Sequence, residues 1–152
     1  MRYTNLTKAE LADNFERVAN DFYKFIEVNK LDKTFVDMGE ASDCRWEHEN
    51  LCDTPACHGG WAAIMYGIDS NPYVDESDFY ERGASCLAKK LGFASTYMLE
   101  GWAKHYPEYW GNNNGANMFI YENAFNKSHD FPLIVIPDWY MGVVNNLRNC
   151  EK

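Results

Sequence analysis

The sequence lacks long apolar runs and is poor in basic residues. No stretch approaches the ~20 apolar residues that a membrane-crossing helix needs, and the segment from Met1 to Thr7 has no apolar core of the kind found in secretory signals. We therefore expect a cytoplasmic protein that does not enter a membrane. With 14 Lys and Arg against 23 Asp and Glu, the net charge is -9, which disfavours contact with phosphate backbones. Direct nucleic-acid binding is not expected. This charge suits a basic protein partner or mimicry of nucleic acid on a basic protein, but a role in solubility alone is the interpretation that we favour.

The cysteines are too few for a disulfide framework, and their number is odd. The chain has 5 Cys in 152 residues, and a chain of this length can bury a core without covalent cross-links. Thiols are therefore the expected state in a reducing compartment. Hydrophobic residues make up 46% of the sequence, which is enough to offset the entropy of ordering the chain. We expect residues 1–152 to form a single globular domain.

Apolar periodicity predicts a mainly α fold, namely a compact single domain of about five helices. Such a domain can also include a short two-stranded β element. The first helix is predicted over residues 7–30, because Thr7 and Glu10 match a capping box. Its apolar stripe at three- and four-residue steps should be core. That stripe consists of Leu11, Phe15, Val18, Phe22 and Phe25. Further helices are predicted over residues 54–67, 76–91 and 96–106 and from Pro137 onward, and short strands over residues 34–38 and 133–136.

The densest set of chemically reactive side chains lies between Cys44 and His58. Five soft-metal ligands occur there within fifteen residues, namely Cys44, His48, Cys52, Cys57 and His58. On a continuous helix the first three would share one face, and Cys57 would complete a tetrahedral zinc site after a turn. The spacing of the set matches no zinc-finger pattern, and the set has no knuckle of paired ligands of the kind found in structural zinc sites. Zinc therefore remains an alternative to a protein without a cofactor.

Cys57 is also a candidate nucleophile. It falls at the third position of the helix predicted to begin after Thr54, where backbone N–H groups and the helix dipole favour a thiolate. The adjacent His58 points about 100° away on such a helix, so a base would have to come from elsewhere in the fold, with His48 and His105 among the candidates. The competing interpretation, which we favour, is that Cys57 is a small buried residue.

Cys52 and Cys57 together would suit a redox role. A turn at Thr54 and Pro55 could bring the two α-carbons within the distance of a disulfide bond. In the cytoplasm such a bond would be a redox switch and not a structural cross-link.

A second candidate site combines aromatic faces with amide groups. The segment contains Trp102, His105, Tyr106, Tyr109 and Trp110, followed by Asn112, Asn113 and Asn114. Its candidate binding residues are Trp102, Tyr106, Trp110, Asn112 and Asn114. This chemistry is typical of pockets that bind sugars or nucleobases. The alternative is an aromatic edge of the core followed by a polar turn, in which asparagine adopts left-handed or side-chain-bonded conformations.

Trp61 follows two consecutive glycines, Gly59 and Gly60, in a predicted helix. Each glycine costs about 1 kcal/mol relative to alanine, so a close approach by another helix or by a ligand should compensate. Trp61 is thus a candidate binding residue, although packing in the core is the interpretation that we favour.

Three segments resemble a family of small proteins of bacteria and their phages that has no established function. They are Phe35-Val36-Asp37-Met38, the run from Cys52 to Ala62 with its CxTxACxxGWA-like motif, and Trp110-Gly111-Asn112 with Gly115, Met118 and Phe119. The resemblance spans residues 35–147 and implies a compact intracellular domain with a special role for Cys52 and Cys57. The chain has Asp53 where the family pattern has glycine, which makes the turn before the helix less permissive.

No catalytic constellation is complete in the sequence. We therefore favour a non-enzymatic, intracellular protein-interaction or accessory module of bacterial or phage origin. Two alternatives stay open: a thiol-dependent enzyme or redox protein centred on Cys57 with Cys52, and a zinc-stabilised domain that uses the ligands between Cys44 and His58.

Overall fold

The chain is mainly helical, as the sequence predicts. The computed structural model describes residues 3–31, 35–37, 58–67, 76–109 and 130–149. Within these ranges there are five α-helices, one short 3-10 helix and a two-stranded sheet. In chain order they are α1 (Lys8–Val28), β1 (Phe35–Asp37), α2 (His58–Met65), α3 (Glu76–Leu91), α4 (Thr96–His105), η2 (Pro107–Tyr109), β2 (Asp130–Pro132) and α7 (Val135–Asn149).

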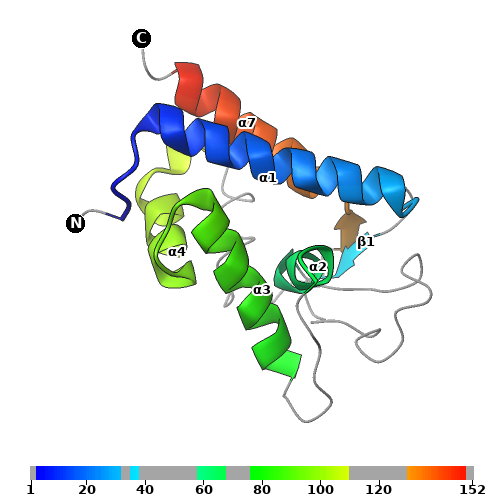
Figure 1. The fold of residues 1–152 in the computed structure, drawn as a ribbon. Helices are drawn as coiled ribbons and strands as arrows, with labels where there is room; N and C mark the ends of the chain where they lie inside the picture. Colours follow the sequence, from blue (N-terminus) through cyan, green and yellow to red (C-terminus); the bar gives the residue numbers. More distant parts are fainter. Residues whose placement is uncertain (1–2, 32–34, 38–57, 68–75, 110–129, 150–152) are drawn as a thin grey trace.

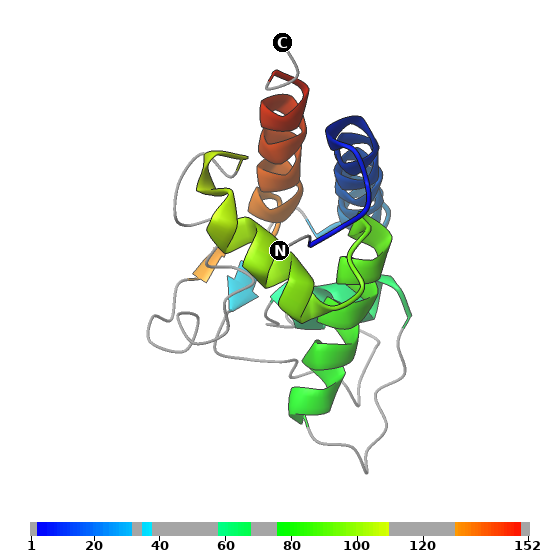
Figure 2. The ribbon, with the colours of Figure 1, turned by 90° about the vertical axis from the view of Figure 1, so that its left-hand side faces the viewer.

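The first and last helices form the centre of the fold. Helices α1 and α7 lie side by side and run in opposite directions (Figures 1 and 2). Helix α3 packs beneath α1, and the short helix α2 packs against α3. Helix α4 closes one end of the molecule, near the N-terminus, whereas α2 and the small sheet lie at the other end (Figure 1). No helix in the described ranges is both long enough and apolar enough to cross a bilayer.

Helix α1 begins and ends with hydrogen-bonded caps. The predicted capping box is confirmed, because the Glu10 N–H donates to Thr7 Oγ1 at 3.1 Å and the Thr7 N–H donates to Glu10 Oε1 at 3.0 Å. At the other end Lys30 adopts a left-handed conformation with φ 55, and the Leu31 N–H donates to the Ile26 carbonyl at 2.9 Å. This is a Schellman motif, which ends the helix two residues before the predicted boundary.

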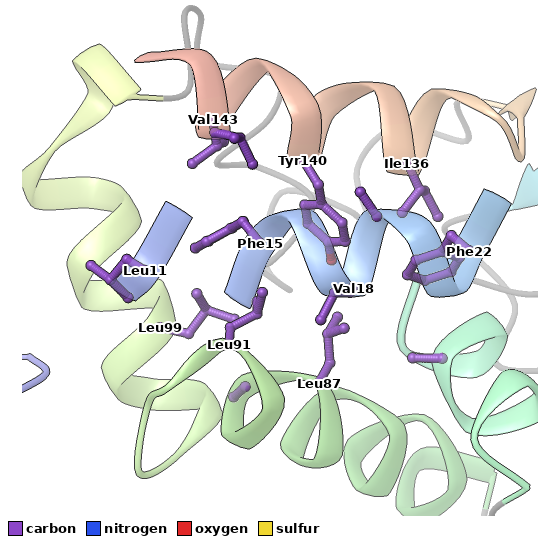
Figure 3. Packing of buried hydrophobic residues seen from close by; sticks show 14 of the residues in the cluster. Leu11, Phe15, Val18, Phe22, Leu87, Leu91, Leu99, Ile136, Tyr140 and Val143 are labelled. Carbon is purple, nitrogen blue, oxygen red and sulfur yellow. The ribbon is translucent and has the colours of Figure 1, made fainter. Parts of the chain in front are cut away.

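The predicted apolar stripe of α1 forms the centre of the core. Leu11, Phe15, Val18 and Phe22 are all buried, whereas Phe25 is half-buried. Figure 3 shows Tyr140 of α7 pointing toward α1 between the two buried phenylalanines, with ring centroids 5.7 Å from Phe15 and 5.9 Å from Phe22. Interlocking side chains of this kind exclude water from the α1–α7 contact.

The predicted boundaries of α3 and α4 are confirmed within one residue. Gly92, with φ +105, follows the last residue of α3, and the Phe93 N–H donates to the Ala88 carbonyl at 2.9 Å. Helix α4 starts after Ser95, whose hydroxyl accepts from the Met98 N–H at 3.2 Å, and it ends just before Pro107. The predicted start of the second helix at residues 54–55 lies outside the described residues.

The strand predicted at residues 133–136 is wrong. The strand is Asp130–Pro132, which pairs antiparallel with β1 so that Val36 lies opposite Phe131. Leu133 and Ile136 are both fully buried, and the Ile136 N–H donates to the Leu133 carbonyl at 3.1 Å, which is the geometry of a turn that leads into α7. Helix α7 therefore begins two residues before Pro137. A proline is tolerated in the first turn because N–H groups there have no intrahelical partner.

Candidate binding groove

A partly open groove lies where both ends of the described chain meet α4. Its cavity volume is about 610 Å³. Four parts of the chain form its walls: residues 3–6, the first turns of α1, the α4–η2 segment and the last turns of α7. Figure 2 shows α4 in front of the α1–α7 pair on this side of the molecule.

Three aromatic side chains form one wall of the groove. Trp102 and Tyr106 are one helical turn apart at the end of α4, and Pro107 prevents the helix from continuing. The short helix η2 then folds back, with the Tyr109 N–H donating to the Tyr106 carbonyl at 3.1 Å. As a result, the Tyr109 ring centroid lies 5.6 Å from Trp102 and 5.5 Å from Tyr106, with interplanar angles of 22° and 26°. The proline-terminated helix thus gathers the rings into one cluster.

The cluster is anchored in the core on one side and accessible on the other. Trp102 is 3% exposed and its ring packs against Phe15 at 5.7 Å and Phe93 at 5.4 Å. The Tyr109 carbonyl accepts a hydrogen bond from Asn146 Nδ2 of α7 at 2.8 Å, which fixes η2 to the last helix. Tyr106 is only half-buried. Rigid rings with an accessible face are well suited to binding, because little side-chain entropy is lost on contact.

One wall of the groove already holds a cation. The Nζ atom of Lys8 lies 5.7 Å from the centroid of the Tyr109 ring, within the range of a cation–π interaction. Lys8 is the first residue of α1, and the capping box at Thr7 sets the direction in which the chain enters that helix.

A charged contact holds the α1–α7 pair together next to the groove. Arg148 Nη1 lies 3.1 Å from Glu16 Oε2 and Arg148 Nη2 lies 3.2 Å from Asp13 Oδ1. The hydrogen bond to Glu16 is the main reason that the Arg148 pKa is raised. The preceding residue, Leu147, lines the groove.

The structure brings together only part of the predicted aromatic site. Trp102 and Tyr106 line the groove, whereas Trp110, Asn112 and Asn114 lie outside the described residues. The lining residues that sequence analysis did not include in this site come from segments remote from α4, namely Tyr3, Thr4, Leu6, Lys8, Leu11 and Leu147. No local pattern signals their proximity to Trp102, because it arises from the packing of the two terminal helices.

Trp61 lies in the core and away from this groove. It is 0% exposed on α2, and its ring centroid lies 6.4 Å from that of Phe25. The structure therefore gives it a packing role in the described part of the fold.

The predicted cysteine and histidine cluster falls almost entirely outside the described residues. This holds for Cys44, His48, Cys52 and Cys57, and His58 is described only as the first residue of α2. Within the described ranges, no group of three potential metal ligands occurs, and Cys86 is a free, half-buried thiol. The zinc, redox and nucleophile interpretations thus remain predictions.

No known protein family, curated protein or solved structure matches this chain. The resemblance to small bacterial and phage proteins therefore stays a prediction, and function has to be argued from the groove itself.

Proposed function

We propose that this protein is a non-enzymatic, intracellular interaction module that binds a basic segment of another protein in the aromatic groove. The proposal is carried by one observation: Trp102, Tyr106 and Tyr109 form a wall that already accommodates the Lys8 ammonium group, 5.7 Å from the Tyr109 ring. The face of an aromatic ring attracts ammonium and guanidinium groups, and arginine also stacks on it. A lysine or arginine side chain of a partner would find the same chemistry at the half-buried ring of Tyr106.

The distribution of charge supports a basic partner. Residues 32–81 contain twelve acidic and two basic residues, a net charge of -10, whereas residues 1–31 are neutral and residues 82–152 carry +1. The whole excess of negative charge thus belongs to one stretch of the sequence. The net charge of -9 would therefore attract a basic partner to the molecule as a whole, and the groove would make the contact.

The test is selection of peptides from a random library on the purified full-length chain. We expect the selected peptides to be enriched in arginine and lysine. Their affinity, measured by calorimetry, should fall as the salt concentration rises, because the attraction is electrostatic. Selected peptides without basic residues would contradict the proposal.

Tyr97 in α4 and Tyr106, the C-cap residue of the same helix, offer a matched pair of variants for the same measurement. Tyr106→Ala removes an aromatic face of the groove and should weaken binding about 10-fold, the loss typical of a moderate interface residue. Tyr97→Ala is the control, because Tyr97 is on the same helix, is 73% exposed and does not line the groove. Equal affinities for the wild type and Tyr106→Ala would mean that the peptides bind elsewhere.

A further inference from the structure

We infer that residues 3–5 form a strap that closes one side of the groove, and that a partner reaches the face of Trp102 only when this strap detaches. The involvement of a partner rests on the proposed function, whereas the strap itself rests on the contacts described below. Tyr3 and Thr4 line the same cavity as Trp102. Neither belongs to a helix or strand, and both are half-buried.

The strap fits into the fold because α4 has a glycine at the point of contact. A Cβ atom at Gly101 would lie 2.5 Å from Cε1 of the Tyr3 ring, closer than carbon atoms approach in folded proteins, and 3.1 Å from Cδ1, which is a tight contact. Glycine destabilises the interior of a helix relative to alanine. Its presence at position 101 is explained by the space that the Tyr3 ring occupies.

A second contact holds the strap at the turn between α3 and α4. The Thr4 hydroxyl donates a hydrogen bond to the Gly92 carbonyl at 2.8 Å, and the same oxygen accepts from the Leu6 N–H at 3.2 Å. Leu6 precedes the N-cap residue of α1 and, like Leu11 one turn into that helix, lines the groove. These are the two positions of a hydrophobic staple, which fixes the entry of the chain into the helix. The strap would therefore pivot just before Leu6.

Exposure along α4 increases with distance from the strap, and Phe15 and Phe93 also contribute to the burial of Trp102. Trp102, which follows the glycine under the Tyr3 ring, is 3% exposed, whereas Tyr106, one turn further on, is half-buried. The Tyr3 ring also lies 5.9 Å from the ring of His105, at the edge of the aromatic cluster. Detachment of Tyr3 would extend the accessible aromatic surface from Tyr106 to Trp102.

The strap is tested first without any partner, by fluorine NMR of protein labelled with 5-fluorotryptophan. The Trp102 signal is assigned from its absence in Trp102→Phe. Tyr3→Ala removes the aromatic ring, and Gly101→Ala places a methyl group in the space that the ring occupies. Both variants should make the Trp102 signal sensitive to solvent. Two controls should leave it unchanged: Tyr3→Phe, which keeps the ring, and Gly142→Ala, since a Cβ at Gly142 on α7 would meet no atom within 4 Å. A cooperative melting transition in each variant shows that it is folded.

The second readout is the affinity for a selected basic peptide. If only the detached state binds through Trp102, Tyr3→Ala should bind about 3- to 10-fold more tightly, because the competent fraction of molecules rises. A Trp102 signal unchanged in both Tyr3→Ala and Gly101→Ala would overturn the strap, whatever the peptide selection yields. Weaker peptide binding by Tyr3→Ala would also overturn it, since Tyr3 would then be part of the binding surface. If Trp102 becomes solvent-sensitive but the selection yields no basic peptide that binds, the strap is supported and the proposed function fails.

Discussion

The Tyr66 hydroxyl donates a hydrogen bond to Oδ2 of Asp21 at 3.0 Å and so ties the end of α2 to the middle of α1. The ammonium group of Lys90 on α3 lies 4.6 Å from the centroid of the same ring. Three helices therefore meet at one tyrosine. Burial, and then the negative charge of Asp21, raise the pKa of Tyr66 well above its ordinary value.

A similar contact joins the two central helices and leads to a prediction for alkaline pH. The Tyr23 hydroxyl donates to Asp138 Oδ1 at 2.5 Å, and burial followed by this hydrogen bond raises the pKa of Tyr23 to about 12. The ordinary tyrosine pKa is about 10, so between these two values the folded state holds a proton that the unfolded state has lost. The stabilisation is thus fully present below about pH 10 and is lost as the pH rises through the folded-state pKa.

We therefore expect the free energy of unfolding to fall above about pH 10, and to fall less steeply in Tyr23→Phe and Tyr66→Phe. Urea unfolding at a series of pH values measures this difference. Lysine side chains also titrate in this pH range, but they do so in all three proteins and therefore do not contribute to the difference between the slopes. Identical slopes in the wild type and both variants would show that neither hydroxyl is protected in the folded state.

Two glycines should respond to alanine in opposite ways. Gly142 lies within α7, and a Cβ there would meet no atom within 4 Å. Gly142→Ala should therefore stabilise the protein by about 0.5–1 kcal/mol through helix propensity. Gly92 has φ +105, and a Cβ there would overlap with Leu6 Cδ1, so Gly92→Ala should destabilise the protein by about 1–3 kcal/mol. Chemical denaturation measures both changes, and a destabilised Gly142→Ala would contradict the exposed position of that face of α7.

The C-terminal cap of α1 offers a stabilising substitution. Lys30 has φ 55, a left-handed conformation that glycine adopts without steric cost. Lys30→Gly should therefore raise the free energy of unfolding by about 0.5–1 kcal/mol. Lys30→Ala is the control, because it removes the charge and keeps the steric cost. If both substitutions had the same effect, the charge and not the backbone conformation would be responsible.

The predictions for Cys44, His48, Cys52 and Cys57 are decided by mass spectrometry. For the interaction module we expect native spectra of protein purified without reductant or chelator to show no metal, and all thiols to react slowly with an alkylating label. A bound metal, together with a melting temperature lowered by a chelator, would support the zinc-stabilised domain. A Cys52–Cys57 bond, or a Cys57 that reacts faster than free cysteine, would support the thiol-dependent alternative.

Secondary structure was predictable where the signal lies within one turn of the chain. The capping box at Thr7, the glycine after α3 and the proline after α4 act through neighbouring backbone groups, so α1, α3 and α4 were located from sequence alone. The start of α7 was misassigned because Leu133 and Ile136 are apolar residues three apart, a spacing that a short buried strand and a helical turn both permit. Strand β2 ends at Pro132, which lies opposite the first residue of β1. The two strands are separated by most of the chain, so no local pattern signals this pairing.

The sequence by itself determined the helical class, the buried stripe of α1 and the presence of aromatic residues at the end of α4. These properties follow from side-chain periodicity and from local hydrogen bonds, which depend on residues close together in the chain. Only the tertiary structure decided that Trp61 is buried while Tyr106 lines a groove, and that Tyr3 covers Gly101. Such contacts join segments far apart in the sequence, and their geometry is set by the packing of whole helices and not by any local pattern.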